Sequence, residues 1–210
     1  MEKQDWKSGL ARFSEWFACL AYINLLWIGF TLLGLLFLGF VPATVAMFTV
    51  LRKWMRRKLE MSIFKEFWTS FKKEFVKSNA AGLILILIGY VLYVDVMVYE
   101  FGDSLYQQIF QLLLYILAFV YLLAIVFFFP VYVQFELKWY QYLKLSILMA
   151  FSSPFRALWM LFIGYGTIFV MSKIPGIIPF FLGSAIAYFW LMIALPLFHK
   201  LELQEGKNNK

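Results

Sequence analysis

The stretch LRKWMRRKLEMSIFKEFWTSFKKEFVKS, residues 51–78, separates two long apolar runs. It holds nine Lys or Arg and three Glu, so it contributes +6 of the chain's formal charge of +7. Residues 16–51 before it and residues 78–94 after it carry no charge. Because a spanning helix needs about 20 apolar residues, the pattern predicts membrane-spanning helices joined by a basic segment.

The composition of the whole chain indicates the same class. Of its 210 residues, 63% are hydrophobic and only 15% are charged, whereas soluble domains average roughly 25% charged. Cys19 and His199 are the only residues of their types, which excludes a cysteine or multi-histidine metal site. The sequence has no phosphate-binding glycine loop, HExxH or GxSxG motif. We therefore expect no catalytic residues, no metal, no cofactor and no enzymatic activity.

The predicted fold is an all-α, polytopic bundle of transmembrane helices with amphipathic helices at one membrane face, in a single domain over residues 1–210. The N-terminal residues lack the pattern of a cleaved signal peptide, so we expect the first apolar run to stay in the protein. A short polar tail follows at residues 199–210. The five expected spans are residues 20–45, 78–98, 105–132, 152–172 and 175–198.

The first apolar run is too long for one straight span. Its 36 residues would extend roughly 54 Å as a helix, against a hydrocarbon core of about 30 Å. One interpretation is a single helix that kinks at Pro42, and this is the one we favour. The alternative is a turn at GFVP, residues 39–42, after which the rest of the run is either re-entrant or a second short span; if residues 17–51 form such a hairpin, the protein has six spans.

The distribution of Lys and Arg predicts the orientation in the membrane. Residues 52–77 carry nine of them, and the segment 136–156 and the C-terminal tail carry three each. We therefore expect the loop 52–77 and the C-terminus to be cytoplasmic. With five spans the N-terminus lies outside; with a hairpin it moves inside.

Five aromatic side chains between residues 64 and 75 fall on one helical face, with Ser62 as the expected N-cap. Such a helix can lie in the headgroup plane and present its lysines to anionic lipid. It can equally pack under the bundle and dock a partner, whereas nucleic-acid binding needs exposed stacking aromatics. The residues expected at the membrane interface or in partner docking are Arg52, Lys53, Trp54, Arg56, Arg57, Lys65, Trp68, Lys72, Lys73, Lys138 and Trp139.

Residues 53–73 and 138–157 resemble each other. Both begin with Lys-Trp, both contain Ser-Ile, and both place a Phe five residues after that Ser. This predicts a parallel repeat of span, amphipathic helix and span, with halves at residues 17–98 and 105–172 and an extra span at 175–198. The other interpretation is that juxtamembrane segments share a composition because they share an environment.

Uncharged polar residues inside the spans are the candidates for a polar path. They are few in this sequence, and each could instead bond a neighbouring helix. The candidates are Asn24, Asn79, Gln107 and Gln111.

The run YINLLWIGFTLLGLLFLGFVPATVAMFTVLRKW, residues 22–54, resembles the YesL-like family of bacterial membrane proteins, a domain of unknown function. FSEW at residues 13–16 and FKEFWTSFKKEFVKSN at residues 64–79 fit the same family. Members are found beside ABC-type carbohydrate uptake systems and glycan-degrading enzymes. The resemblance implies a multi-pass protein of the bacterial plasma membrane with an accessory role in sugar import or its regulation, and it supplies no catalytic residues.

Two functions follow as expectations. The first is a multi-pass accessory protein that contacts anionic headgroups and docks on sugar-uptake permease subunits through its basic helices. The second is a small transporter or permease component with a polar path at the repeat interface.

Overall fold

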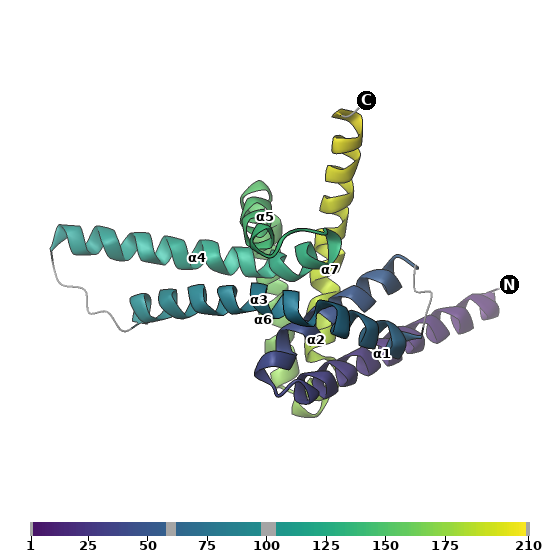
Figure 1. Ribbon diagram of the computed structural model, residues 1–210. Coiled ribbons are helices and arrows are strands. Elements are labelled where there is room, and N and C mark those ends of the chain that lie inside the picture. The colour runs from purple at the N-terminus through teal and green to yellow at the C-terminus, as the bar shows by residue number, and fades with distance from the viewer. Residues whose placement is uncertain (1, 58–61, 98–103, 209–210) are drawn as a thin grey trace.

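The computed structural model describes the backbone of residues 2–57, 62–97 and 104–208. Over these ranges the chain folds into seven α-helices and one short 3-10 helix, with no strand (Figure 1). This confirms the all-α fold. The elements are α1 Glu2–Leu33, α2 Phe37–Met55, α3 Ile63–Met97, α4 Leu105–Gln134, α5 Trp139–Ser152, α6 Pro154–Ser172, η1 Pro175–Ile177 and α7 Ile178–Asn208.

Five helical segments are long and apolar enough to cross a membrane. They correspond in order to the five spans expected from the sequence, although several are longer than expected. The segments are Phe13–Leu33, Ile63–Met97, Leu105–Gln134, Pro154–Ser172 and Pro175–Leu201.

The first apolar run forms a hairpin of two helices, so the single helix kinked at Pro42 is wrong. The Trp27 indole on α1 donates a hydrogen bond to Thr44 Oγ1 on α2 at 3.0 Å, and the helices run antiparallel from a turn at residues 34–36. Pro42 is buried within α2, so GFVP is not the turn either. The N-terminal end of α1 therefore lies at the same end of the hairpin as the C-terminal end of α2.

The backbone conformation of two leucines creates this turn. Leu35 and Leu36 have φ of 59° and 62°, in the left-handed region that costs a non-glycine residue about 1–3 kcal/mol. Gly34 and Gly39 pack backbone against backbone, and a Cβ on either would overlap the other's main chain. Close packing of the two helices thus offsets the strain in the turn.

The basic segment leads into one uninterrupted helix. Lys65 N–H donates to Ser62 Oγ at 3.4 Å, which confirms the expected N-cap, and α3 then continues for 35 residues. In the second half of the chain, the amphipathic helix α5 is separate from the span α6, because Ser153 breaks the helix and Pro154 begins the next. The two halves differ in this respect, and the repeat stays a prediction.

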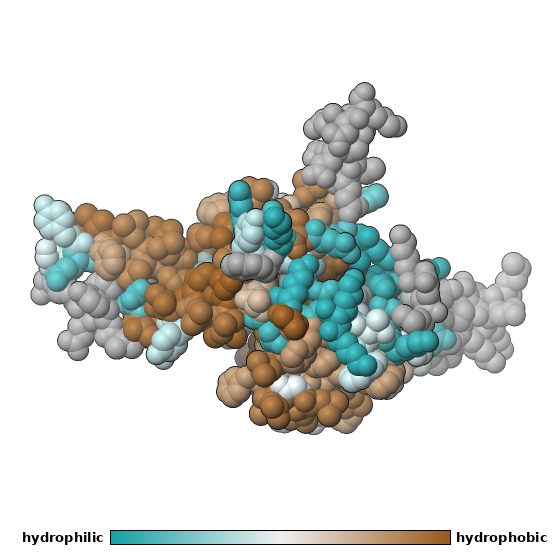
Figure 2. Space-filling view, viewed as in Figure 1, coloured by the Kyte–Doolittle hydropathy of each residue, from teal (hydrophilic) through white to brown (hydrophobic). Residues whose placement is uncertain are grey.

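Apolar and polar surfaces are segregated over the molecule. The C-terminal half of α3 and the N-terminal half of α4 form an arm that points away from the other helices (Figure 1). Apolar side chains cover this arm, and a band of hydrophilic residues lies over the middle of the molecule (Figure 2). Charged groups therefore collect where α2, α3, α4 and α5 meet.

Asn24 joins α1 to the start of α7 and is fully buried. Its amide donates to the carbonyl of Pro179 at 2.7 Å and accepts from the N–H of Ser184 at 2.9 Å. Both bonds reach the backbone of α7, so Asn24 fixes the crossing of the two helices.

We predict that Asn24→Leu lowers the free energy of unfolding by about 1–3 kcal/mol, because it removes two buried hydrogen bonds between α1 and the backbone of α7. The measurement is thermal unfolding in detergent. Gln111→Leu is the control, since Gln111 bonds only Tyr115 on the surface of α4. Equal melting temperatures for the two variants would contradict the assigned role of Asn24.

Candidate functional site: a charged cavity

A cavity of about 620 Å³ lies where α2, α3, α4 and α5 meet. This volume is within the range of small-molecule sites, about 300–1,000 Å³. Its wall carries four cations and three carboxylates, so the lining has a net charge of +1. These charged residues are Arg52, Lys53, Lys73, Lys77, Glu66, Glu74 and Glu136.

An ion pair at one end of the cavity ties α2 to α3. Lys53 Nζ lies 2.7 Å from Glu66 Oε1, and the Ser70 hydroxyl donates to the same oxygen at 3.4 Å. The Glu66 side chain is 5% exposed and that of Lys53 is 37% exposed. Because an unpaired buried carboxylate is costly, the contact with Lys53 offsets part of the cost of burying the Glu66 side chain.

Two stacked tyrosines form the opposite side. The rings of Tyr132 on α4 and Tyr142 on α5 lie 4.2 Å apart at 26°, and the Tyr132 hydroxyl donates to Glu74 Oε2 at 3.0 Å. Lys77 Nζ lies 5.1 Å from the Tyr142 ring centre, within the range of a cation–π contact. Glu74 and Lys77, about one turn apart on α3, therefore contact α4 and α5 respectively.

The links between helices are completed by main-chain and amide contacts. Arg52 Nη1 donates to Gln134 Oε1 at 3.0 Å, joining the ends of α2 and α4. The Tyr142 hydroxyl accepts from Leu137 N–H at 3.2 Å and donates to the Phe135 carbonyl at 3.3 Å. The segment between α4 and α5 is thus held against the cavity.

The cavity wall presents charged, hydroxyl and aromatic groups. No group of three or more His, Cys, Asp or Glu that could hold a metal occurs among the described residues. Glu66 and Glu74 are each engaged by a partner within the wall. The mixed charges and the aromatic pair suit a polar small molecule or a charged segment of a partner protein.

Six of the predicted docking residues form two groups. Arg52, Lys53 and Lys73 line the cavity. Lys65, Lys72 and Trp68 lie on the exposed face of α3, where Lys72 Nζ sits 4.1 Å from the Trp68 ring centre.

The other predicted docking residues have separate positions. Arg56 and Arg57 follow the end of α2, and Lys138 is exposed at the start of α5. Trp54 faces inward against Tyr188 on α7, with ring centres 6.2 Å apart. The side chain of Trp139 lies outside the described residues.

The aromatic face of α3 packs within the protein. Phe67 and Phe71 are buried, and their rings lie 4.9 Å and 5.1 Å from that of Phe30 on α1. Phe64 and Trp68 contact the same ring from the exposed edge. This face binds the α1–α2 hairpin, and the lysines of α3 are left on the surface.

The four candidates for a polar path lie in separate places. Asn24 bonds α7, as described above. The Asn79 amide donates to the carbonyls of Leu38 on α2 and Phe75 on its own helix, both at 2.9 Å. Gln107 caps α4 through the N–H of Ser104, and Gln111 bonds Tyr115. None of the four lines the charged cavity.

A polar stripe on α3 predicts one wall of the cavity, although the sequence analysis above did not identify it. Glu66, Ser70, Lys73 and Lys77 recur every three or four residues on one face of α3, which is the spacing of a polar stripe. Tyr132 and Tyr142 carry no comparable signal, because their pairing depends on how α4 and α5 meet.

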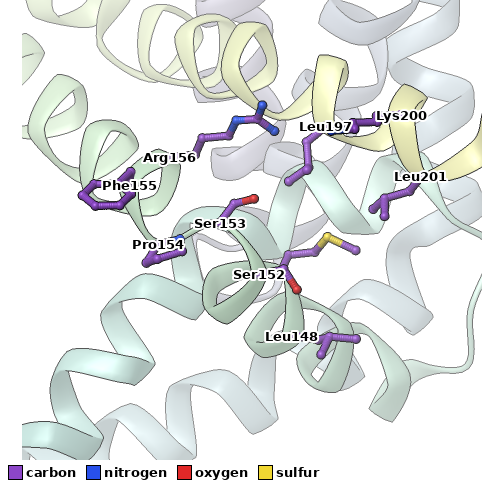
Figure 3. Close-up of a pocket in the computed structure, with 10 residues that line it drawn as sticks. Leu148, Ser152, Ser153, Pro154, Phe155, Arg156, Leu197, Lys200 and Leu201 are labelled. Carbon is purple, nitrogen blue, oxygen red and sulfur yellow. The ribbon is translucent and has the colours of Figure 1, made fainter. Parts of the chain in front are cut away.

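A second pocket of about 510 Å³ lies between the end of α5, the start of α6 and α7. Figure 3 shows Arg156 reaching from α6 towards α7, which carries Leu197 and Lys200. Ser152 and Ser153 add hydroxyl groups, and the pocket lining contains no acidic residue. The two cations beside apolar wall residues resemble the basic pockets that bind anionic headgroups.

The all-helical fold, with five helical segments long and apolar enough to cross a membrane, is that of a multi-pass membrane protein, and a charged cavity lies among its helices. A family described as "Protein of unknown function, DUF624" matches residues 20–96. No solved structure matches the chain significantly.

Three proteins of Bacillus subtilis (strain 168) are similar over most of the chain. "Uncharacterized protein YteU" is 36% identical over 99% of this chain and 93% of its own length. "Uncharacterized protein YesL" is 32% identical over 95% and 94%, and "Uncharacterized protein YesV" is 31% identical over 88% and 89%. The chain belongs to this YesL-like family of unknown function.

The Lys53–Glu66 pair gives a direct test of the cavity wall. We predict that Lys53→Met lowers the free energy of unfolding by about 2 kcal/mol, because it leaves the Glu66 carboxylate buried without a cation. The double variant Lys53→Met/Glu66→Leu should recover most of this loss. Thermal unfolding in detergent measures both.

Lys65→Met is the matched control, because it removes an exposed lysine from the same helix. Its effect should stay within about 0.5 kcal/mol. A Lys53→Met variant no less stable than Lys65→Met would show that the pair does not support the wall.

Proposed function

We propose that the protein is a non-enzymatic accessory subunit of a membrane uptake system, and that it docks on the permease through the exposed basic face of α3. The observation that carries this proposal is the division of α3 into two faces. Phe67 and Phe71 anchor the helix to the hairpin, while Lys65, Lys72 and Lys73 are exposed. A rigidly held row of cations suits an acidic surface on a partner.

The proposed orientation places this face in the bacterial cytoplasm. Arg52, Lys53, Arg56 and Arg57 lie at the end of the hairpin away from its turn, where Lys53 contacts Glu66 near the start of α3. Short basic segments stay on the cytoplasmic side. The hairpin then brings the N-terminus to the same side. The pocket containing Arg156 and Lys200 supports contact of this region with anionic headgroups.

The class of transported substrate rests on the family resemblance. YesL-like proteins are found beside ABC-type carbohydrate uptake systems, and we extend this association to the present chain. The proposed role is to assist carbohydrate import or its regulation, with sugar-uptake permease subunits as partners and without nucleic acid.

A small transporter or permease component is the second candidate. The volume of the charged cavity favours it, because about 620 Å³ would hold a small polar solute. The separation of Asn24, Asn79, Gln107 and Gln111 favours the accessory role, since these residues do not form one path.

We predict that Lys65→Glu/Lys72→Glu/Lys73→Glu releases a permease that co-purifies with the wild-type chain in mild detergent. Reversed charges repel an acidic partner surface, so the permease-to-protein ratio should fall at least tenfold, about 1.4 kcal/mol or more. Quantitative mass spectrometry of the purified complexes gives this ratio. Lys144→Glu/Lys173→Glu/Lys200→Glu reverses the same number of exposed charges elsewhere and should retain the permease.

A different outcome would favour the transporter. If the purified chain alone moves a labelled sugar into liposomes, the accessory role is wrong. Retention of the permease by the α3 triple variant would show that docking does not use this face.

A further inference from the structure

The connection between α1 and α2 differs in composition from every other connection in the chain. Residues 32–38, LLGLLFL, contain no polar side chain. The connections at residues 56–62, 98–104, 135–138 and 172–174 each contain a charged residue, and that between α5 and α6 is Ser153. A turn that lay in water would be expected to carry such residues.

The side chains of this turn point outward. Leu33, Leu35, Leu36, Phe37 and Leu38 are each more than half exposed, and Phe37 is 90% exposed. Contiguous apolar surface of this kind marks contact with a membrane or with another protein.

Five of the seven N–H groups from Gly34 to Phe40 bond to carbonyls within the hairpin. The N–H groups of Gly34, Leu35, Leu36, Phe37 and Phe40 all donate to carbonyls within the hairpin, at 2.7–3.0 Å. A turn in water can leave such groups to solvent, whereas hydrocarbon offers them no partner.

One carbonyl of the turn region is bonded from outside the hairpin. The Asn79 side chain on α3 donates to the Leu38 carbonyl at 2.9 Å. Acyl chains have no hydrogen-bond donor, so Asn79 supplies the one that the Leu38 carbonyl needs if the turn lies in lipid.

The position of the turn along α3 shows how far the hairpin reaches. Val41 packs on Gly82, where a Cβ would clash with it, so the first turns of α2 lie beside the start of the apolar half of α3. From Gly82, α3 continues for a further 15 residues to Met97, which is roughly 22 Å of helix. The hairpin therefore ends well short of the far end of α3.

We infer that the α1–α2 hairpin is a re-entrant element, whose tip at residues 32–38 lies among the acyl chains and whose two ends emerge on the same face of the bilayer. The occupant of the exposed apolar surface is lipid. The unbroken run of exposed apolar side chains favours lipid over water as the surrounding, and the close Gly34–Gly39 contact keeps the tip narrow.

Spin-label accessibility in liposomes tests this inference. In a Cys19→Ala background, a nitroxide is attached at Phe37→Cys, with Arg57→Cys and Lys173→Cys as controls in two polar connections. Power saturation then measures collisions with oxygen, which concentrates in lipid, and with a water-soluble nickel complex. At position 37 we expect the oxygen-to-nickel ratio to exceed that of both controls severalfold.

Two results would overturn the inference. High nickel accessibility at position 37 would place the tip in water, so that the hairpin crosses the membrane. Low accessibility to both reagents would place it against protein, either a second copy or a partner. Leu36→Cys provides a second label site if the label at position 37 disturbs folding, which circular dichroism would reveal.

Discussion

The inability of hydrocarbon to hydrogen-bond is the constraint on which the rest of this structure depends. Leucine and phenylalanine side chains can face lipid from any helix, but carboxylates, ammonium groups and free backbone groups cannot. The chain meets this constraint by gathering its charges where α2, α3, α4 and α5 meet. There Lys53 neutralises Glu66, and Tyr132 bonds Glu74, so the groups most expensive to bury pair with one another and hold the helices together.

The hairpin follows from the same constraint. An apolar run too long for one span could have crossed the membrane as a single kinked helix, and the structure instead reverses it after Leu33. Gly34 and Gly39 permit close packing, and hydrogen bonds within the hairpin engage most N–H groups of the turn. In consequence the basic end of α2 and the start of α1 lie together, and α3 presents its lysines beside them.

The sequence predicted the features that depend on local pattern. Five helices apolar enough to cross a membrane, the helix that begins after Ser62 and its aromatic face all follow from hydropathy and spacing. The position of the turn was not predicted, because leucine rarely adopts the positive φ found at Leu35 and Leu36. Pro42 is the stronger helix-breaking signal in the sequence, but it lies inside α2. The cavity was missed for a different reason: Arg52 and Gln134 meet across 82 positions, and periodicity carries no information about such pairs. Asn24 and Asn79 were noticed as polar residues in apolar runs, but the structure uses both to join helices.

The central claim is that a hairpin, and not a single span, begins the chain, so that both termini lie on the side of the basic segment. Cysteine labelling in intact cells tests it most directly, with Asp5→Cys and Asn208→Cys in a Cys19→Ala background. The account predicts that an impermeant maleimide labels neither position until the cells are broken, and then labels both. Labelling of position 5 in intact cells, with position 208 still protected, would contradict it.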